Sequence, residues 1–361
     1  VRIMAYTTID DPSAYFQTTI YTGTGSDNTA ITNVGNSDLQ PDFIWIKKRS
    51  ATGQHVLSDT NRGIVKVLNS NSTAAEDSNS EGEMVKSVQS DGFTLGDSQA
   101  GQGDTNFTSG GTYVAWQWKA NGGTTASNSD GSITSTVQAN TTAGFSIVTY
   151  NGEGDSQATV GHGLGVKPQV IIPKIRGTTG SWHMYHEGVD SSAPENYGLL
   201  LNANNARADD PGFYNDTAPT SSVFTVGTYN NFNNDYVAYC FAEKQGYSKF
   251  GRYTGNQSTD GPFLYFGFKP AFLMVKKTTS AENWFLIDNK RHPFNDGQIP
   301  RVIPNNTDAE SEDASIAGDF LSNGFKIKAT QNMINESGTY IYMAFAEHPF
   351  VSSKGVPTTA R

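Results

Sequence analysis

Short runs of alternating apolar and polar residues dominate the chain, and the clearest of these runs occurs three times. Its first copy reads Thr-Tyr-Val-Ala-Trp-Gln-Trp from Thr112, and related runs begin at Asp235 and Thr339. Bulky side chains occupy every second position, which in a strand places them on one face. No segment shows a sustained 3.6-residue period, so the pattern predicts strands and no major helix.

Three further blocks recur in the same order ahead of this run. They are an aromatic residue followed by a glycine turn, a proline followed by an apolar run, and a serine-led block containing phenylalanine. The blocks begin at Tyr21, Pro41, Ser90 and Thr112 in the first copy, at Tyr150, Pro168, Ser222 and Asp235 in the second, and at Tyr253, Pro270, Ser322 and Thr339 in the third. Self-similarity in this order indicates three tandem copies of one module.

The proline-led runs are apolar on both faces. This is typical of a central strand that is covered on one side by the opposing sheet and on the other by a neighbouring module or chain. Pro173 interrupts the run of the second copy, and because proline cannot donate a ladder hydrogen bond we expect a bulge or an edge strand there. With the weaker strands added, each copy has about eight short strands, which favours a two-sheet sandwich of jelly-roll type. A parallel β-helix is the alternative, but its repeat is only about 20–30 residues.

The chain is therefore predicted to be all-β, with three tandem antiparallel β-sandwich modules. Gly, Ser, Thr and Asn dominate the residues between the first two copies, and this composition predicts a linker. The predicted segments are an N-terminal attachment segment at 1–14, modules at 15–120, 144–247 and 248–350, a linker at 121–143 and a C-terminal tail at 351–361.

Composition agrees with short strands joined by polar turns, since 36% of residues are hydrophobic, 17% are charged and 37 are glycine. The formal net charge is −10, which disfavours the phosphate contacts of nucleic-acid binding. No apolar run is long enough to cross a membrane as a helix, so no membrane insertion is expected. The single cysteine, Cys240, excludes an intrachain disulfide and is most simply a small packing residue.

Two copies carry an Asp-x-x-Arg motif, at Asp59 and Arg62 and again at Asp288 and Arg291. We interpret both as structural ion pairs, because a catalytic carboxylate would need a second carboxylate or a base at a defined distance. The second copy lacks the motif. No catalytic residues are predicted, and the chain is not expected to be an enzyme.

Acidic loops recur at one place in each copy, and in the second copy the loop contains Asp209 and Asp210. Oxygen-rich loops can hold Ca²⁺, so these two residues are the candidate metal ligands, although the spacing matches no recognised calcium loop. No other cofactor is expected. His183 and His186 would face opposite sides of a strand, which argues against a zinc pair.

Aromatic residues set among asparagines mark a candidate ligand-binding surface in the second copy. The candidates are Tyr214, Tyr229, Phe232 and Asn233, because exposed rings and amide groups together suit a glycan. An ordinary polar loop is the alternative. Since the second copy also carries Pro173 and lacks the Asp-x-x-Arg motif, a specialised surface is expected there first.

The four blocks resemble a module found in virion structural proteins of marine tailed bacteriophages, particularly those that infect cyanobacteria. The first copy carries the resemblance most fully, in Tyr-Thr-Gly, Pro-Asp-Phe-Ile-Trp-Ile-Lys, Asp-Gly-Phe-Thr-Leu and Tyr-Val-Ala-Trp-Gln-Trp-Lys-Ala. It extends over roughly residues 4–350 and weakens in the later copies. The resemblance implies a fibre, spike or decoration role in a virion, with no catalytic residues to carry over.

The first functional hypothesis is a phage tail fibre or appendage that binds a glycan or protein receptor on the host surface. Several chains would associate, most simply as a homotrimer, together with other virion proteins. A capsid decoration or tail-hub protein without a ligand is the second hypothesis. A polysaccharide depolymerase is the third, and it would require two carboxylates about 5–10 Å apart in an aromatic groove.

Overall fold

The computed structural model describes residues 5–77, 83–97, 104–107, 110–155, 157–313 and 315–358. In these residues the chain forms antiparallel sheets, and its only helices are three 3-10 turns, η1 (Pro12–Ala14), η2 (Pro194–Asn196) and η3 (Thr228–Asn230). The prediction of an all-β chain without a major helix is confirmed. None of the helices in the described residues is long and apolar enough to span a membrane.

The first module consists of a five-stranded sheet, with the order β1-β8-β3-β4-β5, and a three-stranded sheet, β2-β7-β6. Ile44 and Tyr113 of the large sheet pack against Ile31 and Phe93 of the small sheet. Its strands are β1 (Phe16–Thr22), β2 (Thr29–Thr32), β3 (Phe43–Lys48), β4 (His55–Asp59), β5 (Leu68–Asn69), β6 (Val85–Gln89), β7 (Gly92–Leu95) and β8 (Thr112–Trp118).

The second module has an eight-stranded sheet, β16-β15-β14-β13-β18-β11-β10-β9, faced by the pair β12-β17. Val160 and Phe224 of the small pair pack against Val148 and Ala238 of the large sheet. Its strands are β9 (Ala126–Asn128), β10 (Ser135–Asn140), β11 (Phe145–Asn151), β12 (Thr159–Gly161), β13 (Val170–Ile175), β14 (His183–His186), β15 (Tyr197–Leu200), β16 (Ala208–Asp209), β17 (Val223–Thr225) and β18 (Asp235–Phe241).

The third module has a four-stranded sheet, β19-β25-β21-β22, and a three-stranded sheet, β20-β24-β23. Leu264 and Phe325 of the small sheet pack against Leu273 and Phe285 of the large one. Its strands are β19 (Ser248–Gly255), β20 (Phe263–Tyr265), β21 (Phe268–Lys277), β22 (Phe285–Asp288), β23 (Gly318–Leu321), β24 (Gly324–Ile327) and β25 (Gly338–Pro349).

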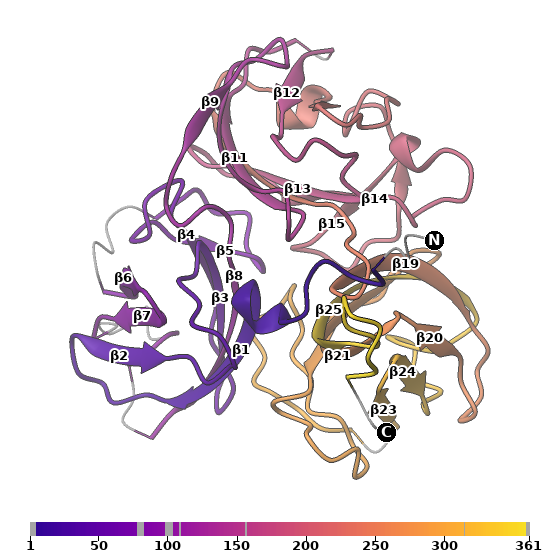
Figure 1. Cartoon of the computed structure of the whole chain (residues 1–361). Helices are drawn as coiled ribbons and strands as arrows, with labels where there is room; N and C mark the ends of the chain where they lie inside the picture. The colour runs from indigo at the N-terminus through magenta and orange to yellow at the C-terminus, as the bar shows by residue number, and fades with distance from the viewer. Residues whose placement is uncertain are drawn as a thin grey trace.

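The three large sheets turn their other faces toward one another around a common centre (Figure 1). One apolar cluster there, which we call the central core, contains residues of all three modules, among them Trp45, Trp116, Tyr239, Met274 and Phe345. The strands that are apolar on both faces therefore bury one face in their own module and the other in the central core. The sequence predicts that the second face of these strands is covered by a neighbouring module or by another chain. The structure shows that neighbouring modules of the same chain cover it.

Cross-strand pairing shows that the modules are equivalent at the level of single residues. Trp45 pairs with Trp116, Ile172 with Tyr239 and Met274 with Met343. All six side chains lie in the central core. The alternation in the closing block thus predicts correctly which side chains share a face.

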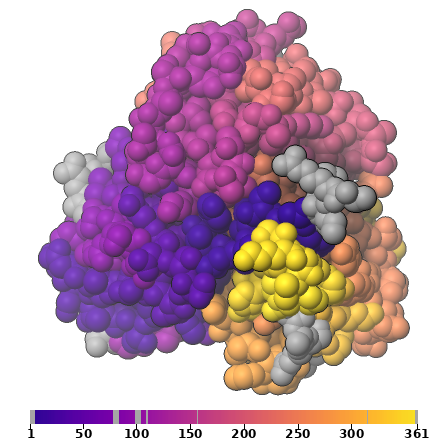
Figure 2. Space-filling view, viewed as in Figure 1, coloured from indigo at the N-terminus to yellow at the C-terminus, as the bar shows by residue number. Residues whose placement is uncertain are grey.

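The N-terminal segment lies on the third module. Ile9 is buried in the central core, and the Tyr6 hydroxyl donates to the carbonyl oxygen of Gly267 at 2.7 Å. The hydroxyl of Ser353, in the C-terminal tail, donates to the Asp10 carboxylate at 2.5 Å, and Figure 2 shows the two segments side by side. Of the predicted attachment segment, residues 1–4 lie outside the described residues, and residues 5–14 join the beginning of the chain to its end.

The predicted linker at residues 121–143 is wrong. Strands β9 and β10 lie within it and continue the large sheet of the second module, where β10 pairs with β11 from Thr136 to Asn140. Val137 and Gln138 of β10 are buried. Composition alone indicated a linker because β10 alternates threonine, glutamine and asparagine with only a few apolar residues, and its apolar face is correspondingly small.

The expectation for Pro173 is also wrong. Its strand, β13, is central, between β14 and β18, and it pairs with β18 in regular register from Val170 to Ile175. The pairing with β14 covers only Val170 and Ile171 and resumes at a single bridge between Lys174 and Trp182. The missing N–H is accommodated because the ladder with β14 lapses at the proline, so neither a bulge nor an edge is needed. A bulge occurs instead beside Pro270 in the third module.

Candidate functional site

Each Asp-x-x-Arg motif forms a buried ion pair within its own module, at the interface with another module. Arg62 Nε lies 2.5 Å from Asp59 Oδ2, and both side chains are fully buried. Arg62 also contacts Glu76, which binds Arg176 of the second module. Burial alone would lower the pKa of Arg62, but the carboxylates of Asp59 and Glu76 outweigh it and raise that pKa. Together the side chains link the first module to the second.

The equivalent cluster links the third module to the first. Arg291 Nε lies 2.6 Å from Asp288 Oδ2, and Glu310 joins Arg291 to Arg49 of the first module. Trp116 Nε1 donates to Asp288 Oδ2 at 3.0 Å. Since Asp59 and Asp288 have no exposed side-chain surface, a substrate has no access to these carboxylates.

The predicted aromatic residues of the second module occupy different environments. Tyr214 is buried in the module core, contrary to its expected place on an exposed loop. Tyr229 and Phe232 are exposed, by 38% and 56%, and line a surface cleft of about 290 Å³. Asn233 is exposed but does not line it, whereas its neighbour Asn234 does.

Another wall of this cleft, which we call the aromatic cleft, is a loop of small and hydroxyl-bearing residues between β13 and β14. It is formed by Thr178, Thr179, Gly180 and Ser181. The Gly177 amide at its start donates to Asn234 Oδ1 at 3.0 Å, which ties the loop to the aromatic wall. The run Gly-Thr-Thr-Gly-Ser in the sequence predicts a turn here, but it does not predict that the turn lines a cleft.

His183 also lines the aromatic cleft. Its ring stacks on Tyr229 with centroids 5.6 Å apart, and Nδ1 lies 2.7 Å from Asn230 Oδ1. Burial lowers the pKa of His183 to about 4, so the imidazole is neutral near pH 7. The sequence pattern bears on His183 only as a possible metal ligand and does not predict this place in the cleft.

The two candidate calcium ligands, Asp209 and Asp210, belong to no larger cluster of possible metal ligands in the described residues. Asp210 Oδ2 accepts a hydrogen bond from the Tyr229 hydroxyl at 2.7 Å, and Asp210 Oδ1 accepts one from the Gly212 amide. Asp209 lies in β16, paired with Tyr197. Asp210 therefore orients the Tyr229 ring, and the described residues contain no group of three or more His, Cys, Asp or Glu side chains placed to hold a metal ion.

The aromatic cleft combines exposed rings with hydroxyl and amide groups. The side chains lining it in the described residues include no carboxylate, so it lacks the carboxylate pair of a glycosidase. Rings that stack on apolar faces and polar groups that bond to hydroxyls suit the binding of a sugar without its cleavage.

A family model described as "Domain of unknown function (DUF7483)" matches residues 11–349, nearly the whole chain. The comparisons with curated proteins and with solved structures found no match.

Proposed function

The chain belongs to the DUF7483 family, and we propose that it is a saccharide-binding protein of a bacteriophage particle, with its receptor site in the aromatic cleft of the second module. The observation that carries the proposal is that two exposed rings, Tyr229 and Phe232, line one cleft together with a hydroxyl-rich loop. The place in a virion appendage rests on the resemblance of the four sequence blocks to phage structural proteins.

The cleft is organised before a ligand binds, which supports this proposal. Tyr229 is held by Asp210 at its hydroxyl and by His183 at its face. Phe213 packs edge-on against both of these rings. A ring fixed in this way loses little conformational freedom on binding, so more of the stacking energy contributes to affinity.

A binding screen against glycans of bacterial surfaces tests the saccharide site. We expect Phe232→Ala to weaken binding about tenfold, equivalent to about 1.4 kcal/mol. Phe263→Ala is the matched control, because Phe263 is exposed by 43% but lies on β20 of the third module. Equal affinity of both variants and the unaltered protein would contradict the assignment of the site.

Location on the particle is tested separately, by labelling intact phage particles with antibody against the chain. Label on the tail supports the receptor-binding role, and label confined to the capsid favours the decoration role instead. A homotrimer of chains stays a prediction, to be tested by light scattering. The apolar faces that suggested it are covered within the chain, by its own three modules.

A further inference from the structure

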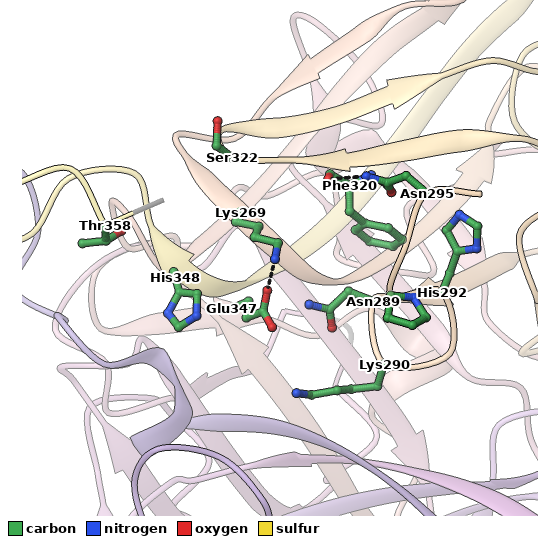
Figure 3. A pocket seen from close by; sticks show the side chains of 11 residues that line it. Lys269, Asn289, Lys290, His292, Asn295, Phe320, Ser322, Glu347, His348 and Thr358 are labelled. Carbon is green, nitrogen blue, oxygen red and sulfur yellow. Dashed lines mark hydrogen bonds and ion pairs between the residues drawn. The ribbon is translucent and has the colours of Figure 1, made fainter. Parts of the chain in front are cut away.

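A second cavity, unrelated to the aromatic cleft, lies in the third module. It has a volume of about 350 Å³, at the lower end of the range for small-molecule sites. Side chains from the start of β21, the loop after β22, the turn between β23 and β24, and the end of β25 surround it (Figure 3). We call it the third-module pocket.

Besides Glu347 Oε2, which lies in an ion pair with Lys269, two buried polar atoms in this pocket have no hydrogen-bond partner in the described residues. They are Asn289 Oδ1 and His292 Nε2, in residues exposed by only 6% and 3%. Buried polar groups are normally paired, so each unpaired atom at a cavity marks a place for a ligand group. The Asn289 carbonyl oxygen needs a donor, and the imidazole nitrogen, whose ring partner Nδ1 lies 3.8 Å from Asp296, suits a hydroxyl.

The charges around the pocket are unequal. Lys269 Nζ lies 2.8 Å from Glu347 Oε2, so these two charges offset each other. Lys290 reaches the cavity from below in Figure 3 and has no ion-pair partner in the described residues. Because the whole chain carries a net charge of −10, an unpaired cation at a cavity is a local feature that favours an anionic group.

From these observations we propose that the third-module pocket binds a polyhydroxylated carboxylate, of which a uronic acid residue is typical. Its carboxylate pairs with Lys290, and its hydroxyls bond to Asn289 Oδ1 and His292 Nε2. The ring of Phe320 forms an apolar wall of the pocket. This site is independent of the proposed receptor function, since it lies in another module and takes a charged ligand.

The test is a titration of the full chain with D-glucuronate, in which ligand-observed NMR measures binding. D-glucose supplies the hydroxyls without the charge, and acetate supplies the charge without the hydroxyls. We expect glucuronate to bind at least about tenfold more tightly than either, because a charge-assisted bond and the hydroxyl contacts act together. Equal binding of acetate would overturn the proposal.

Variants locate the ligand. Lys290→Gln alters an exposed side chain and should weaken glucuronate binding about tenfold, whereas Lys119→Gln, in the first module, should leave it unchanged. Asn289→Ala should also weaken it, and circular dichroism shows whether that variant folds. Full affinity in Lys290→Gln, or loss of affinity in Phe232→Ala, would overturn the assignment to this pocket. Comparison of glucuronate with trigalacturonate distinguishes a site for a free sugar acid from one for an acidic polysaccharide.

Discussion

At the scale of single residues, the interface between the second and third modules differs from the other two at a coupled pair of positions, besides lacking the arginine of the motif. Tyr239 donates to Asp59 at 2.8 Å, and Trp116 donates to Asp288 at 3.0 Å. Cross-strand pairing places His186 where the other modules have aspartate. Met343 of the third module occupies the position of Trp116 and Tyr239 in the other two modules, and its side chain cannot donate a hydrogen bond. The two changes belong together, because a buried carboxylate beside methionine would lose a bond that its charge requires.

Replacing Tyr239 by phenylalanine tests the value of such a bond. Tyr239→Phe removes the donor to a buried carboxylate, so we expect the free energy of unfolding to fall by about 1.5–3 kcal/mol in urea denaturation. Tyr247→Phe is the matched control, since that hydroxyl is also buried but has no hydrogen-bond partner in the described residues. The control should be neutral or slightly stabilising. Equal losses in the two variants would show that the bond to Asp59 contributes nothing special.

His186 makes the interface between the second and third modules sensitive to acid. Its Nε2 lies 3.0 Å from the Tyr342 carbonyl oxygen, and Nδ1 accepts from the Gly188 amide, so the buried ring is neutral. Burial lowers the pKa of His186 to about 4, against about 6.5 in the unfolded chain. The unfolded chain therefore binds the proton first, and stability present above pH 6.5 is lost as the pH falls toward 4.

We expect this loss to amount to roughly 3 kcal/mol between pH 6.5 and 4, since each pKa unit is worth about 1.36 kcal/mol. His186→Gln keeps a donor and an acceptor without the titration, so its free energy of unfolding should depend less on pH in this window. His183 titrates in both proteins and cancels in the difference. Parallel pH profiles from chemical denaturation would contradict the prediction.

At the scale of elements, one buried lysine recurs on the equivalent strand of each module. Lys47, Lys174 and Lys276 lie on β3, β13 and β21, and pair with Val114, Val237 and Ile341. Their amines bind backbone carbonyls, and burial lowers the pKa of each to about 8. In the unfolded chain the pKa is near 10.4, so these groups add stability as the pH rises from 8 toward 10.

Lys174→Met isolates the contribution of one strand. Between pH 8 and 10, the free energy of unfolding of the unaltered protein should rise by about 1–2 kcal/mol more than that of the variant. Cys240 and the buried tyrosines are common to both proteins, so they cancel in the comparison. Lys119→Met, a partly exposed lysine beyond the end of β8, should show no such gain. A constant difference between Lys174→Met and the unaltered protein across this range would contradict the assignment.

The elements also show what local pattern can and cannot predict. The period of two in the closing blocks identifies Trp116 and Tyr239 as members of one face, because side-chain direction in a strand depends only on local backbone geometry. It cannot predict that Trp116 bonds to Asp288, which is distant in sequence. Strand β10 was missed because its polar composition resembles a linker, and the burial of Tyr214 was missed because loop composition does not reveal packing. In the candidate site, Tyr229 and Phe232 were predicted, but the Thr178–Ser181 wall depends on tertiary contact.

At the scale of the whole molecule, Phe345 joins the three modules. Its ring lies 5.5 Å from that of Trp118 in the first module, 5.8 Å from that of Phe241 in the second and 5.8 Å from that of Phe272 in the third. A residue that packs on all three modules couples their unfolding, since loss of its contacts affects each sheet at once.

We expect Phe345→Ala to cost about 3–5 kcal/mol and to reduce hydrogen-exchange protection in β3, β13 and β21 together. Phe325→Ala is the matched control, because Phe325 is equally buried but lies in the core of the third module alone. That control should lower protection mainly in the third module. Unchanged protection in β3 and β13 of Phe345→Ala would show that the modules unfold independently.

The three modules surround one core and belong to one chain, whose N-terminal segment contacts the third module and the C-terminal tail. This arrangement has a consequence for how the sequence can vary. In an assembly of three identical subunits, every substitution appears three times and alters all interfaces together. Here the three copies are covalently consecutive, so dilution cannot separate them and each can change alone. The replacement of an aspartate by His186 at one interface is an asymmetry that a symmetric trimer of short chains could not adopt.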